Sequence, residues 1–224
     1  MATRDVFVTG GTGYLGRRLI PRLLARGHRV RALARPGAEG RLHPACTIVR
    51  GNALDRTTFA AQIAPADTFV QLVGVPHPSP RKAAQFRAVD RVSGLESVAA
   101  APGAGVRHFV YVSVAQPAGM MQDYIAVRAE VEAALRASGL DATILRPWYV
   151  LGPGHRWPCL LLPLYWLMER IPSRRDAARR LGLVTLAQMV DALVDAVEAP
   201  AAGVRVWAVP EIKGKRKTDD QQGT

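Results

Sequence analysis

Short runs of β-branched and aromatic residues alternate along the chain with longer segments in which apolar positions recur every three or four residues. Strands that alternate with helices in this way form parallel sheets joined by crossover helices, so the pattern predicts an α/β fold. Uninterrupted apolar runs such as FVQLVG and HFVYVSV are typical of strands that are buried on both faces of a sheet. Strands are expected at 6–9, 29–34, 47–50, 68–73, 108–113 and 142–146.

Helices are expected between these strands. Gly27 and Gly139 stand where two of them should end, because glycine adopts the left-handed conformation that closes a helix. The stretch LVTLAQMVDALVDAVEAP, 183–200, has apolar residues at helical spacing and predicts a terminal helix, and 205–209 is expected to add a last strand. The other helices are expected at 14–26, 56–63, 81–101 and 123–137.

The pattern changes after Arg146, where 147–172 is rich in proline, tryptophan and leucine. Its uncharged part, 157–168, is too short to span a membrane and is interrupted by prolines. It is interpreted as a lid over a site, a membrane-surface patch or a dimer contact, and its place in the chain favours the lid. We therefore expect one domain over 1–212, a lid-like segment at 157–172 and a disordered polar tail at 213–224.

The composition, with 49% hydrophobic and 21% charged residues, is that of a folded protein with a core. Cys46 and Cys159 cannot form a disulfide framework and lack metal-ligand spacing, so no metal site is predicted. The first strand starts within a few residues of Met1, which leaves no room for a secretory signal. We therefore expect a cytoplasmic protein.

The formal net charge of +12 raises the question of a nucleic-acid or anionic-membrane partner. Nearly all of the basic residues are arginines, and Arg18, Arg22 and Arg26 have the spacing of one exposed helix face. No aromatic residues interleave with them to stack on bases. A solvated, arginine-rich surface is therefore favoured, and no nucleic-acid partner is predicted.

The stretch VFVTGGTGYLGRRL, 6–19, has the order of strand, glycine-rich turn and helix. Gly10 lets the chain turn off the strand, Gly13 lets the backbone approach a pyrophosphate, and Gly16 lets the helix pack close to the sheet. The free N–H groups of the first helical turn then face the phosphates. A plain turn between a strand and a helix needs one glycine, so three at this spacing predict a dinucleotide-binding site.

The second strand ends in RALARPG, with no acid in the place of the one that holds the ribose hydroxyls of NAD. Arg35 occupies this end, and an arginine can bind the 2′-phosphate of NADP with two hydrogen bonds. Arg17, directly after the third glycine, is a second candidate contact. NADP is therefore predicted in preference to NAD, with the alternative that Arg35 is one more surface arginine.

With the motif TGGTGYLG, the strand end YVS and the stretch YIAVR in this order, the chain resembles the atypical short-chain dehydrogenase/reductases. Within them it is most similar to the NAD(P)H-binding branch, with its NmrA-like and complex I 39 kDa subunit-like members. The resemblance implies a Rossmann-type doubly wound parallel sheet with a small C-terminal lobe. Asn52 stands where relatives usually carry an aspartate. The cofactor contacts that the resemblance implies are Gly10, Thr12, Gly13, Tyr14, Leu15, Gly16, Asn52, Ala53, Val73, Gly74, Pro147 and Trp148.

Catalysis in that superfamily resembles a serine–tyrosine–lysine relay. The resemblance assigns to Ser113 the hydroxyl that polarises a substrate carbonyl and to Tyr124 the transfer of a proton. Arg128, one helical turn after Tyr124, stands where a lysine is expected. A cation beside the phenol is expected to lower its pKa from about 10, but arginine does not readily release a proton, so a relay through this position would be lost. The alternative is that Arg128 is a surface charge on an amphipathic helix.

The leading hypothesis is an NADP(H)-dependent oxidoreductase that acts on a small apolar carbonyl or quinone-like compound. The region after Arg146 is short for a large sugar-nucleotide substrate, and its apolar character favours an apolar one. The alternative is an NADP(H)-binding regulator or assembly subunit without turnover, which the exchange at Arg128 favours. Peripheral membrane contact through 157–168 is compatible with either hypothesis.

Overall fold

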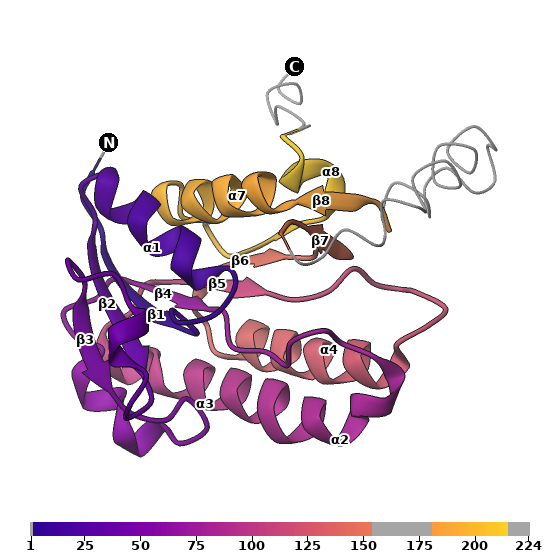
Figure 1. Ribbon diagram of the computed structural model, residues 1–224, viewed down its shortest axis with the longest axis horizontal. Coiled ribbons are helices and arrows are strands. Elements are labelled where there is room, and N and C mark those ends of the chain that lie inside the picture. Colours follow the sequence, from indigo (N-terminus) through magenta and orange to yellow (C-terminus); the bar gives the residue numbers. More distant parts are fainter. Residues whose placement is uncertain (1, 154–180, 215–224) are drawn as a thin grey trace.

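The computed structural model of the chain describes residues 2–153 and 181–214 (Figure 1). The predicted lid-like segment at 157–172, and the predicted tail at 213–224 apart from its first two residues, lie outside the described part. No helix in the described ranges combines the length and the apolar content that crossing a membrane requires.

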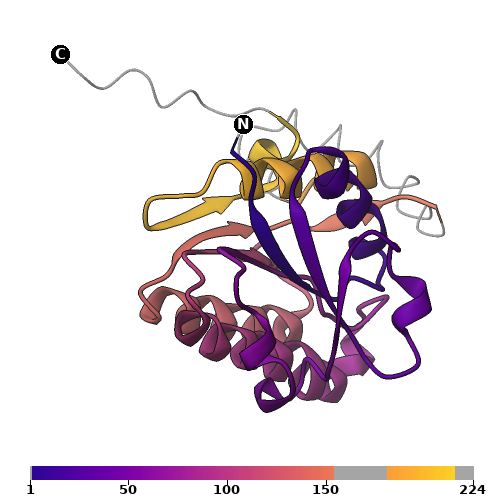
Figure 2. The same cartoon turned by 90° about the vertical axis from the view of Figure 1, so that its left-hand side faces the viewer.

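The central feature is a seven-stranded parallel sheet in the order β3-β2-β1-β4-β5-β6-β9 (Figure 2). The chain builds outward from β1 to β3, returns to the other side of β1 with β4, and continues outward to β9. The strand order therefore reverses between β1 and β4, which confirms the doubly wound Rossmann-type fold. The strands are β1 Asp5–Thr9, β2 Arg29–Ala34, β3 Thr47–Arg50, β4 Thr68–Gln71, β5 His108–Val112, β6 Asp141–Leu145 and β9 Val204–Trp207.

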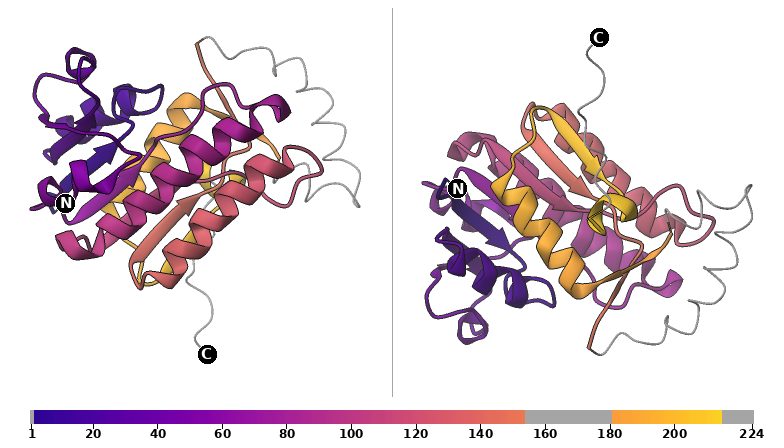
Figure 3. Two further views of the ribbon diagram at one scale, coloured as in Figure 1. Left: turned by 90° about the horizontal axis from the view of Figure 1, so that it is seen from below. Right: turned by 90° about the horizontal axis from the view of Figure 1, so that it is seen from above.

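Helices cover both faces of this sheet (Figures 1 and 3). On one face α1 (Gly16–Ala25) packs beside α7 (Leu186–Glu198), with the short α8 (Val209–Ile212) next to α7. On the other face α3 (Val92–Ala100) and α4 (Gln122–Ala137) run side by side. Gly27 and Gly139 follow α1 and α4 with positive φ angles of 82° and 74°, as expected for residues that end helices.

Two of the expected helices differ from the sequence pattern. The helix predicted at 56–63 is wrong, because the chain forms only two short 3₁₀ turns, Arg56–Thr58 and Ala60–Gln62. Side chains compete for the backbone here: Asp55 accepts the Thr57 N–H at 3.0 Å, and the Thr58 hydroxyl accepts a backbone N–H at 2.9 Å.

The helix predicted at 81–101 is present but composite. It begins with a 3₁₀ turn, Pro80–Lys82, and a single α-turn, α2 (Ala83–Gln85), before a π-helical segment, Phe86–Arg91, leads into α3. The wider winding of a π-helix changes which side chains face the sheet, and such segments are frequent at functional sites.

A small two-stranded sheet was missed by the sequence pattern. In it β7 (Tyr149–Leu151) pairs in parallel with β8 (Leu183–Thr185), so the chain on either side of the undescribed residues is hydrogen-bonded together. The helix α7 follows directly and starts with a capping box, in which the Thr185 hydroxyl accepts the Gln188 N–H at 3.2 Å.

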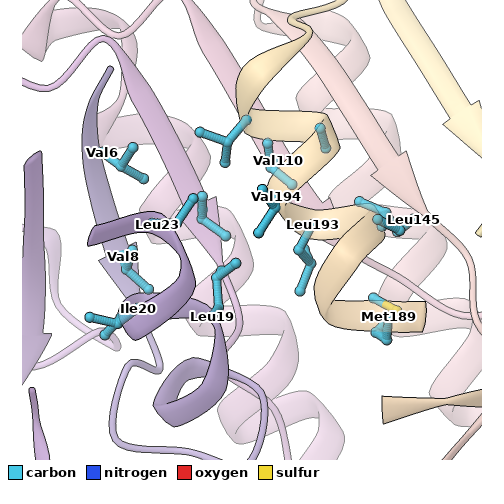
Figure 4. Packing of buried hydrophobic residues seen from close by; sticks show 14 of the residues in the cluster. Val6, Val8, Leu19, Ile20, Leu23, Val110, Leu145, Met189, Leu193 and Val194 are labelled. Atoms are coloured by element: carbon cyan, nitrogen blue, oxygen red, sulfur yellow. The ribbon is translucent and has the colours of Figure 1, made fainter. Parts of the chain in front are cut away.

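The hydrophobic core lies in two layers, one on each face of the sheet. Alternate residues of β1 point to opposite faces. Val6 and Val8 contact the layer under α1 and α7 (Figure 4), whereas Phe7 belongs to the other layer. In that second layer Phe69 lies between Phe7 and Phe109, with ring centroids 5.1 and 4.9 Å apart. The continuous apolar runs in the sequence are explained by this burial on both faces.

We expect Gly94→Ala to lower the free energy of unfolding by about 1–3 kcal/mol. Gly94 lets α3 approach α4 closely, since a Cβ there would lie 2.6 Å from Cγ2 of Val131, a β-branched side chain with little freedom to move. Urea denaturation of the two proteins measures the difference. Gly103→Ala is the control, because a Cβ on Gly103 would have no neighbour within 4 Å and its φ is not positive; equal losses in both variants would contradict the close-packing explanation.

Candidate dinucleotide site

The glycine-rich turn after β1 is packed too tightly for a Cβ at two of its positions, Gly10 and Gly16. Gly10 has φ +73°, and a Cβ on it would lie 2.7 Å from the backbone of Leu72, at the end of β4. A Cβ on Gly16 would lie 2.5 Å from the Gly10 carbonyl oxygen. The start of α1 is therefore held against the turn, and this helix has no side-chain cap at Leu15 and no acid in its first turn. Such an N-terminus can receive an anion.

A cavity of about 420 Å³ opens beside this turn, at the point where the strand order reverses. Ligands of open α/β sheets bind at such points, next to the carboxyl ends of the strands. The cavity brings together most of the predicted cofactor contacts from four separate segments of the chain. The predicted residues that line it are Gly10, Thr12, Gly13, Arg35, Asn52, Ala53, Val73 and Gly74.

The remaining predicted contacts do not line this cavity. Tyr14 lies beneath the Arg18 guanidinium, 5.0 Å from it, with its hydroxyl against Gly152. Leu15 and Gly16 form the start of α1. Arg17 lines a second, shallow groove between α1 and α7, so it lies away from Arg35.

Pro147 and Trp148 follow β6 and precede β7. Pro147 is buried, and its carbonyl oxygen accepts the Ala115 N–H at 2.9 Å, whereas Trp148 is half-buried. Neither residue lines the described cavity, and their predicted position near the nicotinamide stays a prediction.

A second arginine that the sequence did not single out lies at the glycine turn. Arg41 donates from Nη2 to the Thr12 carbonyl oxygen at 3.3 Å, while Arg35 is exposed at the end of β2 and lines the cavity. Glu39, an acid in the same loop, accepts a hydrogen bond from Arg50 at 2.9 Å. The cavity rim at the end of β2 is therefore positively charged, because the nearby acid, Glu39, is paired with Arg50.

The predicted catalytic Arg128 is buried and bound to groups that the sequence analysis missed. Its Nη2 donates to Asp90 Oδ1 at 2.5 Å, and its Nη1 donates to the Val112 carbonyl oxygen at 2.8 Å. The second carboxylate oxygen of Asp90 accepts the Val75 N–H at 3.0 Å. Burial raises the pKa of Asp90, and the Arg128 charge opposes that rise. Arg128 is thus an interior residue, which excludes the alternative of a surface charge.

The phenol of Tyr124 lies between this arginine and the π-helical segment. Its ring centroid is 5.1 Å from the Arg128 guanidinium and 4.8 Å from that of Phe86. Burial raises the pKa of Tyr124, and the positive charge of Arg128 opposes only part of the rise. The expected lowering of this pKa is therefore wrong, because the phenol is desolvated and Asp90 offsets part of the arginine charge.

Ser113 belongs to a different buried cluster. Its hydroxyl donates to Glu132 Oε1 at 2.6 Å, and the same carboxylate accepts from Arg146 at 2.5 and 2.9 Å and from Gln116 at 3.0 Å. Burial alone would raise the pKa of Glu132, but the hydrogen bonds from Arg146 and Ser113 hold it below its usual value. Ser113 is buried and does not line the described cavity.

The structure therefore brings Tyr124 and Arg128 together and turns Ser113 toward another carboxylate. The two carboxylates, Asp90 and Glu132, carry a signal in the sequence. Asp90 lies four residues after the buried Phe86, and Glu132 four residues after Arg128, so each has the spacing of an inward-facing helix position. Acids at such positions are paired when buried.

A parallel doubly wound sheet with a glycine turn and a cavity at its switch point defines a dinucleotide-binding α/β protein. The model of the NAD(P)H-binding family matches residues 10–155, and the chain belongs to this family.

Among curated proteins the chain is similar to a ceramide reductase of Caulobacter vibrioides, with 31% identity over 66% of this chain and 47% of that protein. It is also similar to a divinyl chlorophyllide a 8-vinyl-reductase of Zea mays, with 37% identity over 48% of this chain and 29% of that protein. A 3β-hydroxysteroid dehydrogenase/Δ5→4-isomerase of Mycobacterium tuberculosis is 34% identical over 48% of this chain and 31% of its own length. The chain thus spans less than half the length of the curated relatives it matches.

Solved structures show the same fold. The Bordetella bronchiseptica enzyme WbmH in complex with NAD+ superimposes with a TM-score of 0.68 and 23% identity, over 92% of this chain and 76% of that one. A UDP-glucose 4-epimerase of Thermotoga maritima superimposes with a TM-score of 0.65 and 17% identity, over 95% of this chain and 84% of that one. The predicted NAD(P)H-binding branch is confirmed by the family model, and the predicted Rossmann-type fold by these structures.

We expect Gly13→Ala to weaken the binding of nicotinamide nucleotides at least about tenfold, because a methyl group would stand where the backbone must approach the diphosphate. The substitution should leave the fold intact, since a Cβ on Gly13 would meet only the Gly10 carbonyl oxygen, at 3.1 Å. Fluorescence titration gives the affinities, and thermal unfolding checks the fold. Gly40→Ala, with no neighbour within 4 Å, is the control; a Gly13→Ala protein that binds as tightly as this control would refute the site.

Proposed function

We propose that the protein is an NADP(H)-dependent oxidoreductase whose cofactor occupies the cavity beside the glycine turn. The observation that carries the proposal is that one cavity is lined by the glycine turn and by Arg35. The glycine turn supplies main-chain N–H groups for a diphosphate, and Arg35 supplies a guanidinium at the position next to the adenosine ribose.

The residues of the cavity fit such a cofactor. Gly10 and Gly13 leave the space that a diphosphate needs, and Asn52 and Ala53 follow β3 on the adenosine side. When bound, the nicotinamide ring supplies or accepts a hydride. The segment after β4, which includes Gly74, forms another part of the cavity lining. This chain's contribution is to bind and orient the nucleotide.

The preference for NADP rests on charge. Arg35 is exposed at the end of β2, makes none of the ion pairs found among the described residues, and stands where an acid would favour NAD. Arg41, bound to the Thr12 carbonyl oxygen, adds a second positive charge on the same side. Both guanidinium groups favour a 2′-phosphate over a hydroxyl.

We further propose an apolar substrate that carries a carbonyl or quinone-like group. Relatives are named for reactions on ceramide, on a 3β-hydroxysteroid and on divinyl chlorophyllide a, all of which have large apolar parts. The segment 157–168 of this chain has an apolar composition that suits such a substrate or a membrane surface, although it lies outside the described residues.

Tyr124 is the proton donor in this proposal. The raised pKa of Tyr124 keeps the phenol protonated across the neutral range, and a protonated phenol is the form that reduction of a carbonyl requires. Oxidation of an alcohol requires the phenolate, which burial disfavours.

One observation favours the alternative of an NADP(H)-binding regulator or assembly subunit without turnover. Two members of the predicted trio are bound to buried carboxylates, Arg128 to Asp90 and Ser113 to Glu132. Side chains bound to buried carboxylates in this way stabilise the fold, and their hydrogen-bonding groups are not directed at a substrate. Acceptor-dependent oxidation of NADPH by the wild-type protein separates this alternative from the enzyme.

We expect NADPH to bind more tightly than NADH, and Arg35→Gln to remove the difference. Hydrogen bonds to a charged group contribute about 1.5–3 kcal/mol, so the NADPH affinity of the variant should fall at least about tenfold while the NADH affinity changes little. Fluorescence titration measures both. Arg107→Gln, which alters an exposed arginine before β5 at the opposite end of the sheet, is the control. Equal affinities of the wild-type protein for the two nucleotides would refute the role of Arg35.

We expect Tyr124→Phe to slow acceptor-dependent oxidation of NADPH at least about a hundredfold across a panel of aldehydes, ketones and quinones, since the proton donor is removed. Tyr111→Phe is the matched control, because Tyr111 is fully buried near the same arginine and cannot reach a substrate. If wild-type protein binds NADPH but reduces no acceptor, the non-catalytic alternative holds. If both variants are equally fast, Tyr124 is not the donor.

A further inference from the structure

The Arg128 guanidinium lies directly behind one wall of the cavity. Gly74 and Val75 line the cavity, and Arg128 does not. A Cβ on Gly74 would lie 2.5 Å from Arg128 Nη2 and 3.1 Å from Asp90 Oδ1, so the ion pair touches the back of the Gly74 backbone. The Gly74 backbone thus lies between the Arg128 guanidinium and the cavity that a nucleotide would occupy.

The ion pair joins the wall to three elements. Asp90, in the π-helical segment, uses one carboxylate oxygen for Arg128 and the other for the Val75 N–H. Arg128, on α4, uses its second nitrogen for the carbonyl oxygen of Val112 at the end of β5. Neither side chain is exposed to water by more than 6%. Each hydrogen bond therefore has a fixed direction, and the position of Gly74 and Val75 follows from it.

We propose that Asp90 and Arg128 are positioning residues, a buried ion pair that sets the Gly74–Val75 wall of the cofactor cavity, and that Arg128 moves no proton. The proposal deepens the proposed function and rests on it, since the wall is that of the proposed cofactor site. It assigns a new role to Asp90 and replaces the relay that the resemblance implied for residue 128.

The chemistry of arginine supports this role. A guanidinium stays protonated in proteins, so it cannot pass a proton, but its planar arrangement of donors can bind a carboxylate and a carbonyl oxygen at once. A lysine at 128 would offer one ammonium group for both acceptors. The buried Asp90 therefore requires arginine for the geometry seen here, and each residue accounts for the presence of the other.

The test compares Asp90→Asn and Arg128→Lys with wild type in three measurements: affinity for NADPH and NADH, rate of acceptor reduction, and spectrophotometric titration of Tyr124 without nucleotide. The control is Arg91→Gln. Arg91 pairs with Glu130 at 2.5 Å and joins the same two helical segments as the buried pair, but both side chains of this pair are more than 40% exposed. A merely structural link between the helices would be weakened by all three substitutions.

We expect Asp90→Asn and Arg128→Lys each to weaken binding of both nucleotides at least about tenfold, and Arg91→Gln to leave it unchanged. Asp90→Asn should also lower the pKa of the Tyr124 phenol, because Arg128 and Tyr111 then face it without the neighbouring negative charge. Arg128→Lys should not raise the rate of acceptor reduction. A faster Arg128→Lys protein would show instead that a missing relay limits the reaction.

The outcomes separate this proposal from the proposed function. A wild-type protein that binds neither nucleotide refutes the function, whereas variants that bind as tightly as a binding-competent wild type refute the positioning role. The Tyr124 titration needs no nucleotide, so an unchanged phenol pKa in Asp90→Asn contradicts the inferred electrostatics independently. If circular dichroism shows that Asp90→Asn is unfolded, Arg128→Lys is the deciding variant, because it keeps both charges. Weaker nucleotide binding by Arg128→Lys supports the positioning role, whereas faster acceptor reduction supports a proton relay.

Discussion

The close contact between the first helix and the turn that precedes it is the constraint on which the site depends. Gly16 lies so near to Gly10 and Gly11 that no side chain fits between them, and Gly10 in turn touches the backbone after β4. This contact places the N-terminus of α1 at the carboxyl end of β1, where the strand order reverses. The cavity exists because a helix end, a strand end and the next loop meet without side chains between them.

A second constraint acts on α4, which carries two buried ionic residues of opposite charge one turn apart. Arg128 and Glu132 have the spacing at which helical residues pair with each other, yet each binds elsewhere: Arg128 to Asp90 and Glu132 to Arg146 and Ser113. The helix is thereby attached to the π-helical segment on one side and to the end of β6 on the other. A buried charge without a partner is strongly destabilising, so these pairings fix the orientation of α4 and, with it, of Tyr124.

Much of the architecture could be predicted from local pattern, and the site only in part. Strand positions, the order of strands and helices and the glycine turn follow from short-range periodicity and from the conformational freedom of glycine at Gly10 and Gly27. The arrangement around Arg128 could not be predicted in the same way, because Asp90 is 38 residues away and meets it only through the packing of the π-helical segment against α4. The two-stranded sheet of β7 and β8 was missed for a similar reason, since its strands are brief and far apart in the sequence.

Some arginines of this arginine-rich chain join neighbouring helices by pairing with acids. Arg22 on α1 binds Asp191, and Arg26, directly after α1, binds Glu198; both acids are on α7, so two of the three arginines of the predicted basic face join these helices. The exposed pair of Arg22 and Asp191 contributes little to stability, and both pairs offset positive charge that a polyanion would need. Arg35 is different in kind: it stands at the rim of the cavity and takes part in none of the ion pairs of the described residues. A positive charge without a counter-ion at this place can distinguish the 2′-phosphate of NADP from the 2′-hydroxyl of NAD.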